Sequence, residues 1–297
     1  MKKKLELMAD RIETTLEHHA IPARVTGGTV TPRWVRFQVL PAVGAKISDI
    51  KNLSEELAAA LGVPTCRVSR RGAAVAVEVA RDDPYPVRLL PLLARLPEGG
   101  GTMPAMTAVL GLAEDGAPLL VRLPSPDVGH ILVAGEEGAG KTSLLQTMVL
   151  SLAMMNKPDD LAFIFLGDGL AETSRAIRQA GFPVHRVTSL GAAVIKSAVR
   201  TAGKRVVFVA DDVMGGNGSA QAFERLMKVE RHHYILAWEG APPQEMADLF
   251  KARLVGQGEA GDFIAIAEEK EIRFHGAYVS AEETQEIGAT QREMRNV

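Results

Sequence analysis

Residues 131–142 read Ile-Leu-Val-Ala-Gly-Glu-Glu-Gly-Ala-Gly-Lys-Thr, and this stretch decides the fold class. Four apolar residues enter a glycine-rich turn that ends in Lys141 and Thr142, and a helical apolar pattern follows from Leu144. This order of strand, turn and helix is the context in which the pattern G-x-x-x-x-G-K-[ST] forms a P-loop. The stretch therefore predicts a nucleoside triphosphate site at the end of a buried strand.

Each residue type in this loop has a chemical reason to be there. Glycines let the backbone approach an anion closely, and the loop N–H groups with the helix N-terminus can cradle phosphates. We expect Lys141 to reach the β- and γ-phosphates and Thr142 to offer its hydroxyl to Mg²⁺. The predicted cofactors are thus ATP and Mg²⁺. The candidate contacts are Gly135, Glu136, Glu137, Gly138, Ala139, Gly140, Lys141, Thr142 and Ser143.

A second candidate element follows the apolar run 205–210, which ends in Asp211 and Asp212. In a P-loop sheet, a carboxylate at the C-terminal edge of a buried strand can hold Mg²⁺ through water. Asp211 suits that role, and Asp212 would orient or activate the attacking water as a nearby base. The plain alternative is a strand-to-loop turn that happens to carry acids.

Composition indicates an ordinary globular protein. Of 297 residues, 46% are hydrophobic and 24% are charged, which are usual values for such proteins. Cys66 is the one cysteine, so an intrachain disulfide is excluded and a reducing cytosol is expected. The basic start Met1-Lys-Lys-Lys leads into an amphipathic pattern and not an apolar signal segment. No run reaches the roughly 18 apolar residues of a membrane span. We expect a cytoplasmic chain without a membrane segment.

The sequence predicts two domains, a small α+β domain at 1–97 and a P-loop domain at 98–297, joined at the glycine-rich stretch 98–104. Residues 1–97 contain 15 Lys and Arg and 10 Asp and Glu. The remaining residues contain 19 Lys and Arg and 26 Asp and Glu. A mildly basic first part is compatible with a nucleic-acid partner, but such an excess is usually a solvated surface. In the first domain we expect helices at 5–19 and 50–61 and strands at 35–39 and 74–79.

Beyond the linker, apolar strands alternate with helices, which is typical of a parallel sheet covered on both faces. The expected strands are 108–112, 118–121, 131–134, 161–166, 184–187, 205–210 and 234–237, and the expected helices are 141–155, 172–181, 190–201 and 223–229. The predicted fold class is α/β.

These residues also resemble a known family. Segments 27–31, 35–37, 44–58, 66–68 and 75–79 look like the α domain of FtsK/SpoIIIE-type DNA translocases, and segments 130–142, 165–172, 211–212, 261–264 and 276–280 look like their motor domain. The resemblance spans nearly the whole chain in the correct order. It implies a RecA-like motor that assembles as a hexameric ring around double-stranded DNA and moves it by ATP hydrolysis.

The chain departs from that family at several positions. Asp212 stands where the family has a longer glutamate, and Glu239 stands where it has a glutamine that could sense the γ-phosphate. The interval 190–204 leaves little room for the family's DNA-facing pore loop. Glu136 and Glu137 add negative charge beside the phosphates. Screening by solvent and salt would weaken the repulsion between these charges. Arg253 is the candidate to reach a neighbour's nucleotide, because the segment that carries further arginines in the family is shortened.

Two functions therefore remain open from the sequence. One is a reduced DNA-translocating ATPase that forms a ring, and the other is a nucleotide-dependent assembly or partner-recruitment module with weak or no hydrolysis. DNA contacts would come from basic residues that hold phosphates without reading bases, although each basic segment can equally be a solvated edge. The candidates are Arg67, Arg70 and Arg71 in the first domain and Lys228 and Arg231 in the second.

Overall fold

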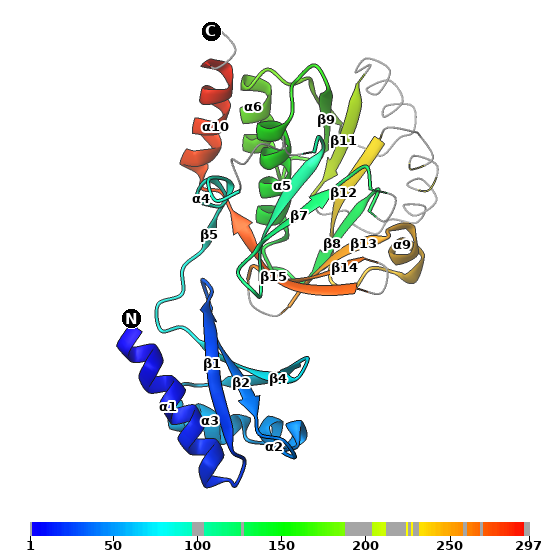
Figure 1. Cartoon of the computed structure of the whole chain (residues 1–297). Coiled ribbons are helices and arrows are strands. Elements are labelled where there is room, and N and C mark those ends of the chain that lie inside the picture. Colours follow the sequence, from blue (N-terminus) through cyan, green and yellow to red (C-terminus); the bar gives the residue numbers. More distant parts are fainter. Residues whose placement is uncertain are drawn as a thin grey trace. The chain divides into compact units, whose positions relative to one another are not determined.

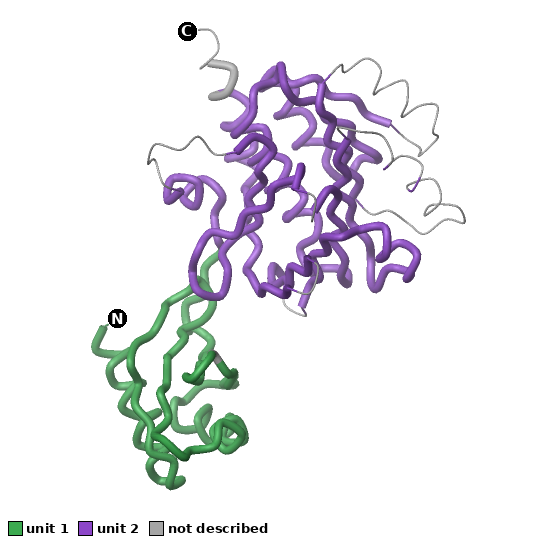
Figure 2. Tube along the Cα trace, turned by 45° about the vertical axis from the view of Figure 1, so that its right-hand side comes forward, with its two compact units in different colours: residues 1–86 green, residues 87–297 purple. Residues whose placement is uncertain are grey.

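The computed structural model describes residues 2–96, 104–125, 128–187, 204–211, 224, 227, 232–257, 260–267 and 270–293. The chain divides into two compact units, Met1–Pro86 and Val87–Val297 (Figure 2). The division falls earlier than the expected linker at 98–104, because strand β5 (Val87–Arg88) pairs in parallel with strand β15 of the second unit. Helix α4 (Leu89–Leu93) follows β5 in that same unit.

Unit 1 is a four-stranded antiparallel sheet in the order β1-β2-β4-β3 with three helices. Its elements are α1 (Lys2–His18), β1 (Ala23–Val30), β2 (Trp34–Pro41), α2 (Ile47–Asn52), α3 (Ser54–Leu61), β3 (Cys66–Arg71) and β4 (Ala74–Ala80) (Figure 1). All three helices contribute to one core, in which Ile12, Ile50 and Leu57 pack against Phe37 and Val77 of the sheet. This arrangement leaves the sheet with one apolar face and one polar face.

The structure confirms the expected helix and strands of this unit with small differences. The single helix expected at 50–61 is two helices that meet at Leu53. Strands β1 and β3 were not predicted as strands. β1 contains two glycines and a register shift at Val25/Gly27, and β3 contains three arginines, so neither shows the apolar alternation on which the prediction depends.

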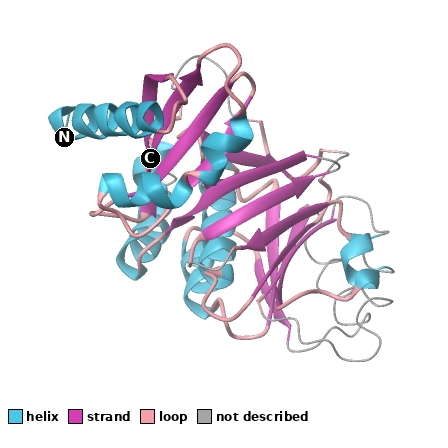
Figure 3. Ribbon diagram, turned by 90° about the horizontal axis from the view of Figure 1, so that it is seen from below, coloured by secondary structure: helices cyan, strands magenta, loops and turns pink. Residues whose placement is uncertain are grey.

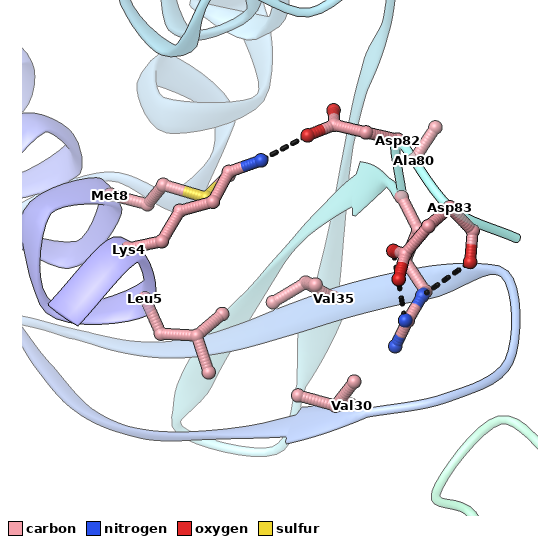
Figure 4. A pocket seen from close by; sticks show the side chains of 9 residues that line it. Lys4, Leu5, Met8, Val30, Val35, Ala80, Asp82 and Asp83 are labelled. Carbon is pink, nitrogen blue, oxygen red and sulfur yellow. Dashed lines mark hydrogen bonds and ion pairs between the residues drawn. The ribbon is translucent and has the colours of Figure 1, made fainter. Parts of the chain in front are cut away.

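Unit 1 also contains a small cavity of about 60 Å³ at one end of its core (Figure 4). Leu5, Met8, Val30 and Val35 supply its apolar walls. Lys4 pairs with Asp82 at its rim, and Arg81 donates to Asp83 Oδ1 over 2.8 Å. These paired charges close the end of the core, and the cavity is about the size of a few water molecules.

Unit 2 is built on a large sheet whose described strands run in the order β10-β9-β11-β12-β8-β13-β14-β15-β6-β7, with β5 paired to β15. Its remaining elements are β6 (Thr107–Ala113), β7 (Pro118–Arg122), β8 (Ile131–Gly135), α5 (Lys141–Met155), β9 (Leu161–Leu166), α6 (Ala171–Gln179), β10 (Val184–Val187), β11 (Arg205–Ala210), β12 (His232–Glu239), α9 (Gln244–Leu249), β13 (Ala252–Gly256), β14 (Asp262–Ala267), β15 (Lys270–Tyr278) and α10 (Ala281–Glu293). Strands β10 to β13 in this order are parallel, and β14, β15, β6 and β7 continue the sheet in antiparallel pairs.

Helices α5, α6 and α10 pack together on one face of this sheet (Figures 1 and 3). The core on that face includes Leu145, Met148 and Phe163, and a second core on the other face includes Phe208 and Trp238 with Met246 of α9. The expected α/β class with a mainly parallel sheet is confirmed. The helices expected at 190–201 and 223–229 lie outside the described residues except at 224 and 227.

The strands expected at 108–112 and 118–121 are β6 and β7. Strands β13, β14 and β15 were not predicted, because they carry charged residues and glycines between short apolar stretches. Across the described residues, no helix has both the length and the apolar character that a membrane crossing requires.

Candidate nucleotide site

The predicted P-loop lies at the carboxyl edge of the parallel strands, between the end of β8 and the start of α5. Gly140 caps α5 with φ 91°, a left-handed conformation that strains any side chain. Ala139 is buried beneath the loop, whereas Glu136, Glu137 and Gly138 are exposed. The loop therefore presents its backbone to solvent at the N-terminus of a 15-residue helix, where the unpaired N–H groups and the helix dipole favour an anion.

Lys141 is the first residue of α5 and folds back over the loop. Its Nζ donates to the carbonyl oxygens of Gly135 and Glu136, each over 2.8 Å. The ammonium is therefore held inside the loop by neutral acceptors. A phosphate that enters the loop can replace these carbonyl oxygens as the acceptor of the Lys141 ammonium, since an anionic acceptor makes the stronger hydrogen bond.

The side chains of Thr142 and Asp211 meet at the carboxyl edge of the parallel strands. Thr142 Oγ1 donates to Asp211 Oδ1 over 3.1 Å, and Asp211 follows β11, which is separated from β8 by β12. Gly169, in the turn between β9 and α6, leaves the space for this carboxylate, because a Cβ there would lie 2.5 Å from Asp211 Oδ2. A hydroxyl and a carboxylate this close fit Mg²⁺, which binds few protein oxygens and takes its other ligands from phosphates and water.

Larger clusters of metal-binding side chains do not occur in the part of the chain that the structure describes. Groups of three or more His, Cys, Asp or Glu side chains suited to a metal ion are absent there. The oxygen pair of Thr142 and Asp211 is the arrangement that a hard divalent cation shared with phosphates would use.

Acidic side chains border the loop. Glu239, at the end of β12, pairs in register with Gly135, and its side chain is exposed. Glu136 is exposed as well, with its Oε1 3.7 Å from the position of a Cβ on Gly240. The structure thus brings Glu239, one of the residues that depart from the family pattern, directly beside the start of the P-loop.

Other predicted site residues are not part of this group. Asp212 lies outside the described residues. Arg253 lies on β13 between Leu132 of β8 and Ile266 of β14, on the face opposite to the buried Leu254 and further from the loop edge than Val255. Its expected contact with a neighbour's nucleotide stays a prediction. Ser143 is half-buried in the first turn of α5.

The sequence analysis missed a group of residues that braces the loop from β13 to β15. The N–H of Gly261 donates to the carbonyl of Ala139 over 3.0 Å, and the N–H of Gly276 donates to the carbonyl of Gly261 over 2.7 Å. A Cβ on Gly256 would lie 2.9 Å from Ala139 Cβ. The glycines at 256, 258 and 261 were the available signal, since glycine permits a close backbone approach.

The side chains of His275 and Asp262 support the glycine segment that contacts the P-loop. His275 Nδ1 lies 2.7 Å from Asp262 Oδ1, and a Cβ on Gly261 would lie 2.9 Å from His275 Cε1. The imidazole thus packs directly on the glycine whose N–H holds the P-loop. The pair connects the antiparallel half of the sheet to the nucleotide loop.

Two family models match the chain in sequence order. One, described as the FtsK alpha domain, matches residues 1–80, and the other, described as the FtsK/SpoIIIE family, matches residues 102–203. The second match contains the P-loop whose geometry is given above. Both parts of the chain are thus similar to the FtsK/SpoIIIE family.

Relatives named DNA translocase FtsK share this similarity. The protein of Caldanaerobacter subterraneus subsp. tengcongensis is 27% identical over 77% of this chain, and that of Vibrio vulnificus is 32% identical over 58%. The chain spans 32% and 18% of the length of these two FtsK proteins.

A solved structure has a related fold. The conjugation coupling protein TcpA of pCW3, a monomer form with ATPgS, superposes with a TM-score of 0.54 at 12% identity, over 97% of this chain and 99% of that one. At this identity the similarity concerns the fold, and it extends over both units.

Proposed function

We propose that this chain binds and hydrolyses ATP as the motor of a ring that moves double-stranded DNA. The observation that carries the proposal is the hydrogen bond from Thr142 to Asp211, which joins the P-loop to the end of β11 beside Lys141. Support also comes from the relatives named DNA translocase FtsK and from a structural neighbour described with ATPgS.

Each residue has a defined task in this proposal. The loop N–H groups and Lys141 bind the phosphates, and Thr142 and Asp211 hold Mg²⁺. The ion neutralises charge on the β- and γ-phosphates. Asp212 orients the attacking water and accepts its proton, and Arg253 of a neighbouring copy stabilises the charge that develops on the γ-phosphate. The hexameric ring and the DNA substrate are carried over from the family.

One observation favours the second function, a nucleotide-dependent assembly or recruitment module with slow hydrolysis. Glu239 pairs with Gly135 at the mouth of the loop, and Glu136 is exposed nearby. A carboxylate there repels the γ-phosphate, and it cannot donate a hydrogen bond as an amide does.

Binding of labelled ATP tests the site. Lys141→Ala removes the point charge and is expected to abolish binding, whereas Lys157→Ala, an exposed lysine beyond the end of α5, is expected to bind like the parent. Equal binding by Lys141→Ala and the parent would contradict the P-loop assignment.

ATP turnover with and without duplex DNA distinguishes the two functions. A motor is expected to hydrolyse ATP faster when duplex DNA is present. Nucleotide binding with DNA-independent, very slow turnover would instead support the assembly module, and Glu239→Gln, which removes the repelling charge and restores an amide donor, should then raise the rate.

A further inference from the structure

The sheet of unit 1 has a polar face opposite its helices. In β2 and β4, side chains alternate between the core (Phe37, Val77) and this second face (Arg36, Glu78). The same alternation extends to β1 and β3 through their registers. We call the second face the arginine face; its residues include Arg24, Thr29, Trp34, Arg36, Gln38, Leu40, Arg67, Ser69, Ala76 and Glu78.

Register separates the arginines of β3. Arg67 pairs opposite Glu78 and lies on the arginine face, whereas Arg70 pairs opposite Val75, a core residue, and lies on the helix side. Arg67 and Arg70, two of the three candidate DNA contacts of the first domain, therefore do not lie on one surface. The fold instead places Arg67 with Arg24 and Arg36, which come from three different strands.

A buried carboxylate organises the centre of this face. Arg36 Nε and one terminal nitrogen each lie 2.7 Å from Glu78 Oε1, and the Glu78 side chain is 5% exposed. Arg67 is 3.9 Å from Glu78 Oε2 and 49% exposed. One negative charge thus balances one of the arginines, and the exposed Arg24 and Arg67 leave the face positive.

A hollow of about 300 Å³ lies on this face, bounded by Thr29, Arg36, Gln38 and Ala76. Its floor is shallow because Gly28 and Ala76 have little or no side chain; a Cβ on Gly28 would lie 2.7 Å from the carbonyl oxygen of Arg36. Hydroxyl, amide and guanidinium groups line its walls. These are donors that bind phosphate oxygens in protein–DNA contacts.

The aromatic side chain of this face indicates which nucleic acid fits. The guanidinium of Arg67 lies 5.3 Å from the ring centroid of Trp34, so that ring face is already occupied by a cation. Binding of single strands depends on aromatic rings that stack on bases, and Trp34 does not offer this one. Arg24 and Arg67, on the outer strands, are about 20 Å apart by strand spacing and rise, which spans several phosphates of a duplex.

We propose that the arginine face binds the phosphate backbone of duplex DNA, and this inference rests on the proposed function. Arg24 and Arg67 make separate phosphate contacts at the two edges of the sheet, and Thr29 and Gln38 donate from the hollow between them. The contact reads no bases, so it suits a protein that holds any sequence.

The test measures binding of the full chain, with ATP analogue, to two labelled duplexes of unrelated sequence over a range of salt concentrations. The double variant Arg24→Ala/Arg67→Ala is expected to weaken binding to both duplexes alike by about tenfold or more. It should also lower the salt slope by about two. Gln38 is exposed at the hollow, and Gln38→Glu should also weaken binding to both duplexes.

Arg70→Ala is the matched control, because it removes an exposed arginine from the same strand on the opposite side. It is expected to keep the parental affinity and slope. If the parent binds no duplex, both the proposed function and this inference fail. If the parent binds and the double variant matches it, the inference alone is wrong.

Two other outcomes also overturn the proposal. A double variant that loses only binding to single strands would assign the face to a different nucleic acid. A double variant that keeps duplex affinity but loses self-association in sedimentation would assign the face to contacts between copies of this chain.

Discussion

At the residue scale, the contact between Thr142 and Asp211 connects the P-loop to β11. Asp211→Asn keeps an oxygen for this hydrogen bond but removes the charge that we propose holds Mg²⁺, so we expect turnover to fall about a hundredfold or more while binding of Mg²⁺-free ATP persists. Mg²⁺ titrations of phosphate release measure this. Asp159→Asn, fully exposed on another loop, is the control, and an unchanged Mg²⁺ dependence in Asp211→Asn would remove Asp211 from the site.

Asp212 has a different expected task at the same scale. Asp212→Asn should slow the chemical step and leave ATP affinity unchanged, because a base acts on the water and not on the bound nucleotide. Asp212→Glu restores the longer acid of the family and should keep or raise the rate. Single-turnover hydrolysis and equilibrium ATP binding, both measured on each variant, separate the effect on rate from the effect on affinity. A parallel loss of affinity and rate would contradict the role of Asp212 as a base.

At the element scale, β13 packs against the P-loop through Gly256. Gly256→Ala places a methyl group 2.9 Å from Ala139 Cβ, and overpacking of this kind costs about 1–3 kcal/mol. Because the loop must shift to relieve it, we expect ATP affinity to fall about tenfold or more. Gly27→Ala, where no atom lies within 4 Å of the added carbon, should bind ATP like the parent. Equal affinities would show that the brace does not position the loop.

At the scale of the whole molecule, histidines at the amino ends of β8 and β12 make stability depend on pH. Burial, and then the nearby His233, lower the pKa of His130 from 6.5 to about 4, and burial also lowers the pKa of His232 and His233. The unfolded chain therefore binds more protons than the folded one below pH 6.5. The stability that these histidines contribute is fully present above pH 6.5 and is lost as the pH falls towards 4.

Urea unfolding at several pH values measures this effect. His130→Gln is expected to flatten the dependence of the unfolding free energy on pH, since one of the buried titrating groups is removed. His19→Gln, an exposed histidine after α1, should leave it as in the parent. An unchanged pH dependence in His130→Gln would contradict the expected contribution of this histidine.

Assembly belongs to the same scale. If neighbouring copies complete the site, mixing Arg253→Ala subunits with Lys141→Ala subunits should restore part of the ATP turnover that each variant lacks alone, because one of the two mixed interfaces then has both Lys141 and Arg253. Sedimentation with ATP analogue and DNA measures the ring itself. A chain that stays monomeric under these conditions would count against the motor.

The sequence by itself determined the P-loop and the α/β class. The strand, loop and start of the helix at 131–142 are contiguous, so local pattern and glycine chemistry are sufficient to recognise them. The apolar runs of β8, β9, β11 and β12 are buried on both faces, and such strands are recognisable from composition alone. Asp211 was predictable because it directly follows one of them.

Only the tertiary structure decided which distant residues meet. Thr142 and Asp211 are 69 positions apart, and their contact depends on the strand order, which no local pattern contains. Gly261 and His275 brace the loop from strands whose glycines and charges conceal them in the sequence. The arginines of β3 looked like one cluster, but side chains of a strand alternate between its faces. Strand pairing therefore separated Arg67 from Arg70 and joined it to Arg24 and Arg36.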